Sequence, residues 1–148
     1  SQTGAAIAAL QEYRDMFPDG KLKGLAEERL MELQDKLVEK EYLNAKLYYD
    51  LGSYFGNCTY GGNNYEACVI TAQNALNDYP YTSMREDFAI LIMKSKYELA
   101  QMSVESKKLQ RYQDAEDECY GFINEYPDSK ERETAEKYIK KCKEITKD

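Results

Sequence analysis

The stretch "ECYGFINEYPDSKERETAEKY" at residues 118–138 joins two helix-like segments through a tyrosine, a proline and a short polar turn. Two other stretches are built in the same way: "ALNDYPYTSMREDFAIL" at 75–91 and "EYRDMFPDGKLKGLAEE" at 12–28. Each contains one of the three prolines of the chain, and each proline follows a small side chain by twelve residues: Ala6 before Pro18, Cys68 before Pro80, and Ala115 before Pro127. The chain therefore contains the same sequence pattern, a helix-like segment, a turn and a second helix-like segment, three times.

This spacing is typical of the second half of the tetratricopeptide (TPR) pattern, in which a small residue allows two antiparallel helices to approach closely. The proline then ends the helix pair, because it cannot continue the backbone hydrogen bonds. Ala45 and Tyr48 match part of the first half of the pattern. Successive prolines are 62 and 47 residues apart, so the repeats are longer than the usual 34 residues. The sequence predicts an all-α chain of TPR-like helical hairpins that stack into a right-handed superhelix.

The predicted segments form one repeat domain that covers residues 1–148. They are the second helix of a truncated repeat at 3–17, an enlarged repeat at 21–79, a further repeat at 83–126 and a capping helix at 129–146. The enlarged repeat is expected to contain a long first helix at about 22–54 and a glycine-rich insert at about 55–64. Two capping boxes are expected to start the helices after the turns, one from Ser83 with Glu86 and one from Asp128 with Glu131. Lys107, Lys108 and Arg111 are expected in a basic turn, which is either solvated or in contact with an anionic group.

The composition argues against several classes of function. The chain has no histidine, so it lacks the commonest general base and the commonest protein ligand of metals. Its net charge is −7, and basic residues alternate with acidic ones, which disfavours nucleic-acid binding. The glycine-rich insert lacks the GxxxxGK[ST] pattern of a phosphate-binding loop. We therefore expect a non-enzymatic protein with no catalytic residue, cofactor or metal.

The four cysteines show no CxxC spacing, which disfavours a zinc site. Cys68, Cys119 and Cys142 are expected to be small buried apolar residues. Cys58 lies in the insert and is the one expected to be exposed. A disulfide between Cys58 and Cys68 stays open as an alternative in an oxidising compartment.

The chain has fourteen tyrosines and no tryptophan, and tyrosine is enriched at protein interfaces. Most are expected to pack between repeats, by position Tyr48, Tyr79, Tyr112 and Tyr126. Those near turns are better candidates for exposed contacts with a partner. The candidate contact residues are therefore Tyr54, Tyr60, Tyr81, Lys107, Lys108 and Arg111.

The segments "RLMELQDKLVEKEYLNAKLYYDLG" at 29–52 and "YEACVITAQNALNDYPYTSMREDFAILIMKSKYELAQMS" at 65–103 resemble the BamD family of tetratricopeptide lipoproteins, which belong to the machinery that assembles outer-membrane β-barrels. The most specific part is D-K-L-x-x-K-E-Y-x-x-A-x-x-Y-Y-x-x-G, from Asp35 to Gly52. The resemblance covers about residues 5–141 and is to the C-terminal part of the family.

The resemblance implies a scaffold at the periplasmic face of the outer membrane, lipid-anchored through a cysteine upstream of Ser1. It also implies protein partners: BamA-like periplasmic domains, other subunits of the assembly machinery and unfolded outer-membrane proteins. No contact with nucleic acid is implied, and contact with the membrane is expected only through the anchor. The alternative is another TPR adaptor of the cell envelope, a peptide- or protein-binding module without a link to barrel assembly.

Overall fold

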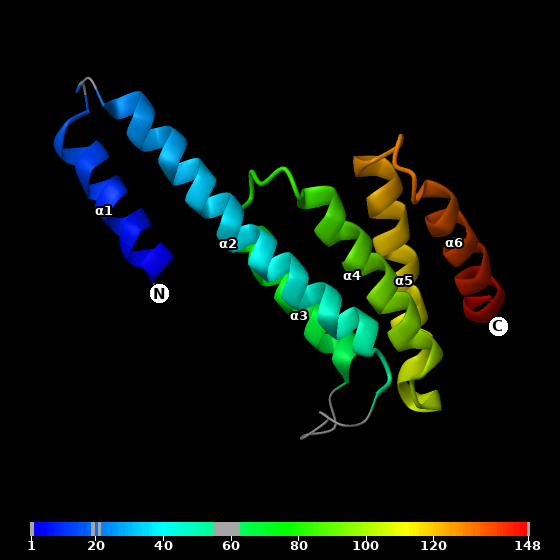
Figure 1. The fold of residues 1–148 in the computed structure, drawn as a ribbon. Helices are drawn as coiled ribbons and strands as arrows, with labels where there is room; N and C mark the ends of the chain where they lie inside the picture. Colours follow the sequence, from blue (N-terminus) through cyan, green and yellow to red (C-terminus); the bar gives the residue numbers. More distant parts are fainter. Residues whose placement is uncertain (1, 19, 21, 55–62, 148) are drawn as a thin grey trace. The chain divides into compact units, whose positions relative to one another are not determined.

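The computed structural model describes residues 2–18, 20, 22–54 and 63–147. Within these ranges every regular element is an α-helix, so the prediction of an all-α chain is confirmed. The elements in chain order, shown in Figure 1, are α1 (Gln2–Met16), α2 (Lys23–Leu51), α3 (Asn64–Asp78), α4 (Arg85–Gln101), α5 (Glu105–Glu125) and α6 (Arg132–Thr146). No helix in the described part combines the length and the apolar character needed to span a lipid bilayer.

The chain divides into two compact units, Ser1–Glu41 and Tyr42–Asp148, and α2 contributes to both. In the first unit, residues of α1 and of the start of α2 line a hollow of about 230 Å³, with Leu10 and Tyr13 on one side and Leu25 on the other. No described residue of α1 is fully buried, and Ala6 is half-buried. The turn after α1 places Phe17 and Pro18 at the surface.

The second unit contains the end of α2 together with α3 to α6. Its closely packed pairs are α3 with α4, α4 with α5, and α5 with α6, and Figure 1 shows α4, α5 and α6 side by side. Small side chains are fully buried where the helices meet, among them Ala45, Cys68 and Ala115. Small residues at such positions let helix backbones approach closely. Larger buried side chains, chiefly Phe88 and Met93 of α4, fill the space between these contacts.

The turns at Pro80 and Pro127 have the same local geometry. The residues before them, Tyr79 and Tyr126, end α3 and α5 with φ/ψ of −130°/65° and −127°/65°. Five residues after each proline an arginine folds back onto the proline carbonyl. Arg85 donates to the oxygen of Pro80 at 2.6 Å, and Arg132 donates to that of Pro127 at 3.1 Å. The repeated sequence pattern therefore corresponds to a repeated local structure at these two turns.

The two predicted capping boxes are wrong. The helices begin later, with Met84 and Glu131 as caps that make no side-chain cap hydrogen bond. The amide of Met84 instead donates to the Thr82 hydroxyl at 3.2 Å, and the amide of Glu131 donates to Ser129 Oγ at 3.1 Å. Hydroxyls bond readily to the backbone amide two residues on. At the second turn this bond takes the Glu131 amide that the Asp128–Glu131 box would have used.

Helix α2 ends at Leu51, three residues before the predicted end. Gly52 follows it with φ of +52°, a left-handed conformation that commonly stops a helix and that favours glycine. Its amide donates to the carbonyl of Tyr48 at 3.0 Å. The predicted insert overlaps the next helix at Asn64, and Asn63 caps that helix by accepting from the amide of Glu66 at 2.9 Å. Tyr60 and Cys58 lie outside the described residues, so the proposed disulfide is not addressed.

The basic turn expected at Lys107, Lys108 and Arg111 is also wrong. The turn comes earlier, because α4 ends at Gln101 and α5 begins at Glu105. The three basic residues therefore lie in the first two turns of α5. The amides of Lys107 and Lys108 both donate to the carbonyl of Val104 at 3.0 Å, which starts the helix.

Candidate functional site

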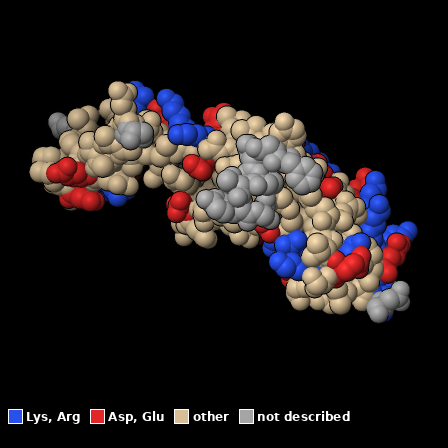
Figure 2. Space-filling model, turned by 90° about the horizontal axis from the view of Figure 1, so that it is seen from below, with Lys and Arg blue, Asp and Glu red and all other residues tan. Residues whose placement is uncertain are grey.

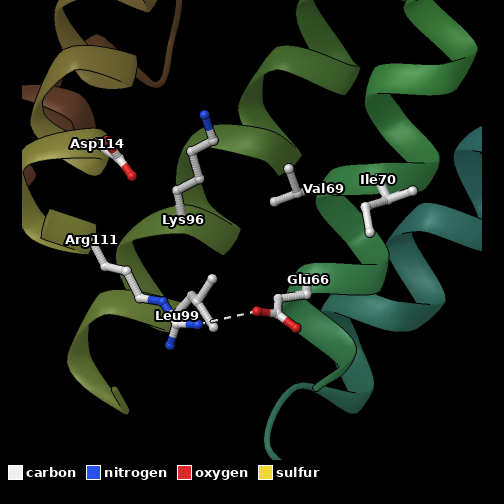
Figure 3. Close-up of a pocket in the computed structure, with 7 residues that line it drawn as sticks. All are labelled: Glu66, Val69, Ile70, Lys96, Leu99, Arg111 and Asp114. Carbon is white, nitrogen blue, oxygen red and sulfur yellow. Dashed lines mark hydrogen bonds and ion pairs between the residues drawn. The ribbon is translucent and has the colours of Figure 1, made fainter. Parts of the chain in front are cut away.

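A groove of about 420 Å³ crosses the second unit where α3, α4 and α5 meet. Figure 3 shows the side chains that line it: Glu66, Val69 and Ile70 from α3, Lys96 and Leu99 from α4, and Arg111 and Asp114 from α5. Its floor is apolar, and its two ends are charged. We take it as the candidate functional site.

The floor consists of apolar side chains that the helix contacts leave uncovered. Cys68, Ala72 and Ala75 form the fully buried stripe of α3. Val69 and Ile70 lie beside that stripe, and Ile70 remains 57% exposed. Solvent contact of a whole isoleucine side chain is unfavourable by about 1.5–3 kcal/mol relative to burial, so covering Ile70 would release part of that free energy.

Arg111 fixes one end of the groove. Its Nη2 pairs with Glu66 Oε1 at 3.2 Å, and its Nη1 donates to Ser103 Oγ at 2.6 Å. The Ser103 hydroxyl in turn donates to the backbone carbonyl of Leu99 at 2.6 Å. This chain of contacts connects α3, the end of α4 and α5, with Leu99 beside the ion pair in Figure 3. A guanidinium held by two partners is a fixed, directional group.

Lys96 and Asp114 lie at the other end of the groove, as Figure 3 shows. Lys96 Nζ pairs with Glu118 of α5 at 2.7 Å. Asp114 accepts a hydrogen bond from Gln110 Nε2 at 3.0 Å. Glu66, Arg111 and Lys96 are thus already ion-paired within the protein, whereas the Asp114 carboxylate is hydrogen-bonded to a neutral amide. The arrangement suits an apolar group flanked by polar ones.

The described cysteines do not line the groove and are fully buried. Burial raises the pKa of the Cys119 thiol to about 12 and that of the Cys142 thiol to about 11. Burial also raises the pKa of Cys68. Because the thiolate is the reactive form, these three side chains are held in the unreactive thiol state at neutral pH. Among the described residues, no group of three or more histidine, cysteine or acidic side chains is placed to hold a metal ion.

The predicted contact residues that the structure describes lie on different elements. Tyr54 follows α2 and is 66% exposed, and Tyr81 lies in the turn between α3 and α4 at 97% exposed. Lys107 is exposed at the start of α5, and Lys108 pairs loosely with Glu105 at 4.0 Å. Of the predicted contacts that the structure describes, Arg111 alone lines the groove.

Sequence reasoning missed the other six residues of the groove. The best available signal was in α3, where Val69 and Ile70 extend the apolar positions beyond the small-residue stripe that packs against its neighbours. An apolar pair outside a packing stripe indicates a second surface to be covered. The charged members gave no signal, since they resemble the other charged residues of these helices.

Figure 2 shows how charge is distributed on one face. Basic and acidic side chains occur there in small interspersed groups of either sign. This pattern agrees with the alternation of charges in the sequence and with the net charge of −7. A nucleic-acid-binding face usually carries a continuous basic area.

A scan against protein-family models finds no match to this chain, and a search of curated proteins finds none either. The resemblance to the BamD family therefore stays a prediction based on the quoted sequence segments.

Proposed function

We propose that this chain is a non-enzymatic, TPR-like scaffold that binds a protein partner through the groove between α3, α4 and α5. The groove takes an apolar side chain from a segment of the partner, placed between the Glu66–Arg111 pair and Lys96. The observation that carries this proposal is the exposure of Ile70, at 57%, on an apolar floor beside the Glu66–Arg111 and Lys96–Glu118 ion pairs.

The TPR-like arrangement is supported by the two equivalent turns at Pro80 and Pro127, each with an arginine on the proline carbonyl. Repeats of this type use their helical surfaces to bind other proteins. Arg111 is engaged in structural contacts, and no described cysteine lines the groove, so the groove is better suited to binding than to chemistry.

The resemblance to the BamD family directs the choice of partner. By that resemblance, the chain acts at the periplasmic face of the outer membrane in a lipid-anchored protein, and the partner is the set of periplasmic domains of a BamA-like barrel protein. The polar ends of the groove then fix the register of the bound segment, since rigid ion pairs accept only a segment with matching polar groups.

A second candidate function is an adaptor of the cell envelope that binds short peptides and has no part in barrel assembly. The size of the groove favours it, because about 420 Å³ accommodates one or a few side chains and not a folded domain surface. Binding of isolated peptides, with none to the periplasmic domains of the barrel protein, would select this alternative.

The test is a pull-down of purified BamA-like periplasmic domains by the full-length protein, carrying either Ile70→Asp or the matched control Leu109→Asp. Leu109 is 50% exposed on a side of α5 that does not line the groove. The proposal expects retention by the wild type and the control, and loss with Ile70→Asp. No retention by the wild type would reject the barrel partner. Equal retention by all three would reject the groove.

A further inference from the structure

A second hollow, of about 170 Å³, lies between α4 and α5, nearer the C-terminal end of α5 than the groove. The residues that line it are Ala89 of α4 and Asp117, Glu118, Gly121, Phe122 and Glu125 of α5. An added Cβ at Gly121 would meet nothing within 4 Å. The glycine therefore leaves open space in which the stem of an incoming side chain can lie.

The groove and the second hollow follow each other along one side of α5. Five of their lining residues recur at alternating steps of three and four positions, so they share one stripe of the helix. They are Arg111 and Asp114 at the groove and Glu118, Gly121 and Glu125 at the hollow. The ion pair of Lys96 with Glu118, at 2.7 Å, joins the two spaces, because Lys96 lines the groove and Glu118 lines the hollow. A segment bound along this stripe passes over both.

Carboxylates outnumber cations among the residues that line the two spaces. Three of the carboxylates are ion-paired: Glu66 to Arg111, Glu118 to Lys96, and Glu125 to Arg85 at 3.1 Å. Asp114 accepts a hydrogen bond from the neutral amide of Gln110. Asp117 is exposed and forms no ion pair with another described residue. The charge that the stripe offers to a partner is therefore negative, at Asp114 and Asp117.

We propose that the partner segment whose apolar side chain enters the groove also carries a lysine or arginine, which enters the second hollow and pairs with Asp117. The inference rests on the proposed function and specifies the chemistry of the bound segment. A long basic side chain suits this place, because its apolar stem can pack over Ala89 and Gly121 while its charged end reaches the carboxylate. An acidic side chain there would be repelled.

The spacing of the two anchor residues follows from the geometry of α5. The middle of the range 111–114 and the middle of the range 117–125 are about 13 Å apart along the axis, at about 1.5 Å per residue. An extended segment covers this distance in about four residues, and side chains four positions apart point to the same face of such a segment. The partner segment should therefore have its apolar and basic residues about four positions apart.

The experiment titrates the isotopically labelled protein with capped glycine–serine peptides and follows the backbone amide signals by NMR. Each peptide carries a leucine and a lysine about four positions apart, in either order. Matched peptides replace the lysine by N-acetyl-lysine, which removes the charge, or the leucine by alanine. We expect saturable binding of the leucine–lysine peptide in at least one order. Acetylation of the lysine should weaken it by about two- to five-fold, and alanine in place of leucine should weaken it as well.

The peptides separate failure of this inference from failure of the groove. Equal binding of the lysine and acetyl-lysine peptides, both weakened by alanine in place of leucine, would overturn the basic anchor and leave the groove in place. Absence of saturable binding by all peptides would overturn both.

Asp117→Asn is the matching variant, and Glu105→Gln is its control. Glu105 is also on α5, its side chain is 94% exposed, and it lines neither space. Asp117→Asn should weaken the lysine peptide by about two- to five-fold and leave the acetyl-lysine peptide unchanged. Glu105→Gln should leave both peptides unchanged. Unchanged binding of the lysine peptide to Asp117→Asn, or equal weakening by the control, would contradict the proposal.

Discussion

The rings of Tyr97 and Tyr138 are stacked, with centroids 3.9 Å apart and planes inclined by 12°. The two residues are 41 positions apart in the chain, and α5 lies between their helices in the sequence. Their contact joins α4 directly to α6 and supports the cluster in which Tyr97 also meets Tyr112. The last helix is therefore held by more than its packing on α5.

Loss of this stack should destabilise the second unit. We expect Tyr138→Ala to lower the free energy of unfolding by about 2–4 kcal/mol, because it removes a large half-buried ring and leaves a cavity. Tyr138→Phe keeps the ring and should change the free energy by less than about 1 kcal/mol. Urea denaturation followed by circular dichroism measures both. Equal effects of the two substitutions would show that the hydroxyl, and not the stack, carries the stabilisation.

Two glycines should respond to alanine in opposite directions. At Gly52 the backbone has φ of +52°, and an added Cβ would lie 2.6 Å from the Tyr65 hydroxyl oxygen. Gly52→Ala should therefore destabilise the protein by about 1–2 kcal/mol through backbone strain and crowding. Gly121 is inside α5, and nothing lies within 4 Å of an added Cβ. Gly121→Ala should stabilise by about 0.5–1 kcal/mol, since alanine favours the helix. Thermal unfolding of the pair checks both signs.

Ser95 offers a stabilising substitution. Its hydroxyl oxygen is fully buried, and the polar group it faces among the described residues is the buried Cys68 thiol, which is a weak hydrogen-bonding group. A buried hydroxyl without a strong partner is unfavourable by about 1–3 kcal/mol. We expect Ser95→Ala to raise the free energy of unfolding by about 1 kcal/mol, with Ser83→Ala, at an exposed turn position, as the control. A clear loss of stability in urea denaturation would mean that the hydroxyl is paired in solution.

Stability should fall at alkaline pH because of the buried thiols. The ordinary thiol pKa is about 9, whereas burial raises the pKa of Cys142 to about 11 and that of Cys119 to about 12. A raised pKa in the folded state leaves the stabilisation intact below pH 9 and removes it as pH rises through the folded values. Between pH 9 and 11 each thiol should reduce the free energy of unfolding by about 1.4 kcal/mol per pH unit.

Urea denaturation between pH 8 and 10 measures this slope before most tyrosines ionise. The double variant Cys119→Ala with Cys142→Ala should show a shallower slope, because two of the titrating groups are gone. A slope that the double variant leaves unchanged would mean that other groups, such as the buried tyrosines, cause the alkaline loss.

Much of the architecture could be predicted from local signals. Small side chains at a fixed distance before a proline indicated closely packed helices, and Cys68 and Ala115 are indeed fully buried. The long helix was predicted because apolar residues recur along α2 with helical spacing, and Ala45 within it is fully buried. These features depend on residues a few positions apart in the chain, so they can be predicted from the spacing of residues in the sequence.

The candidate site depends on which apolar residues the tertiary packing leaves exposed. Val69 and Ile70 are both β-branched and adjacent, yet only the arrangement of three helices determines that they form a floor. The sequence predicted a turn at Arg111 because basic residues cluster near it. The turn in the structure lies at Ser103, where backbone and hydroxyl hydrogen bonds close it. Residues of the same chemical type can thus have different roles, depending on how the helices pack.

The central claim is that a partner protein covers the groove between α3, α4 and α5. Site-specific photo-crosslinking tests it most directly, with a photoreactive amino acid at position 70 or, as the control, at position 109. Mixed with purified BamA-like periplasmic domains, the protein should form a crosslink from position 70 and none from position 109. Absence of a crosslink from position 70, or equal crosslinking from both positions, would contradict the claim.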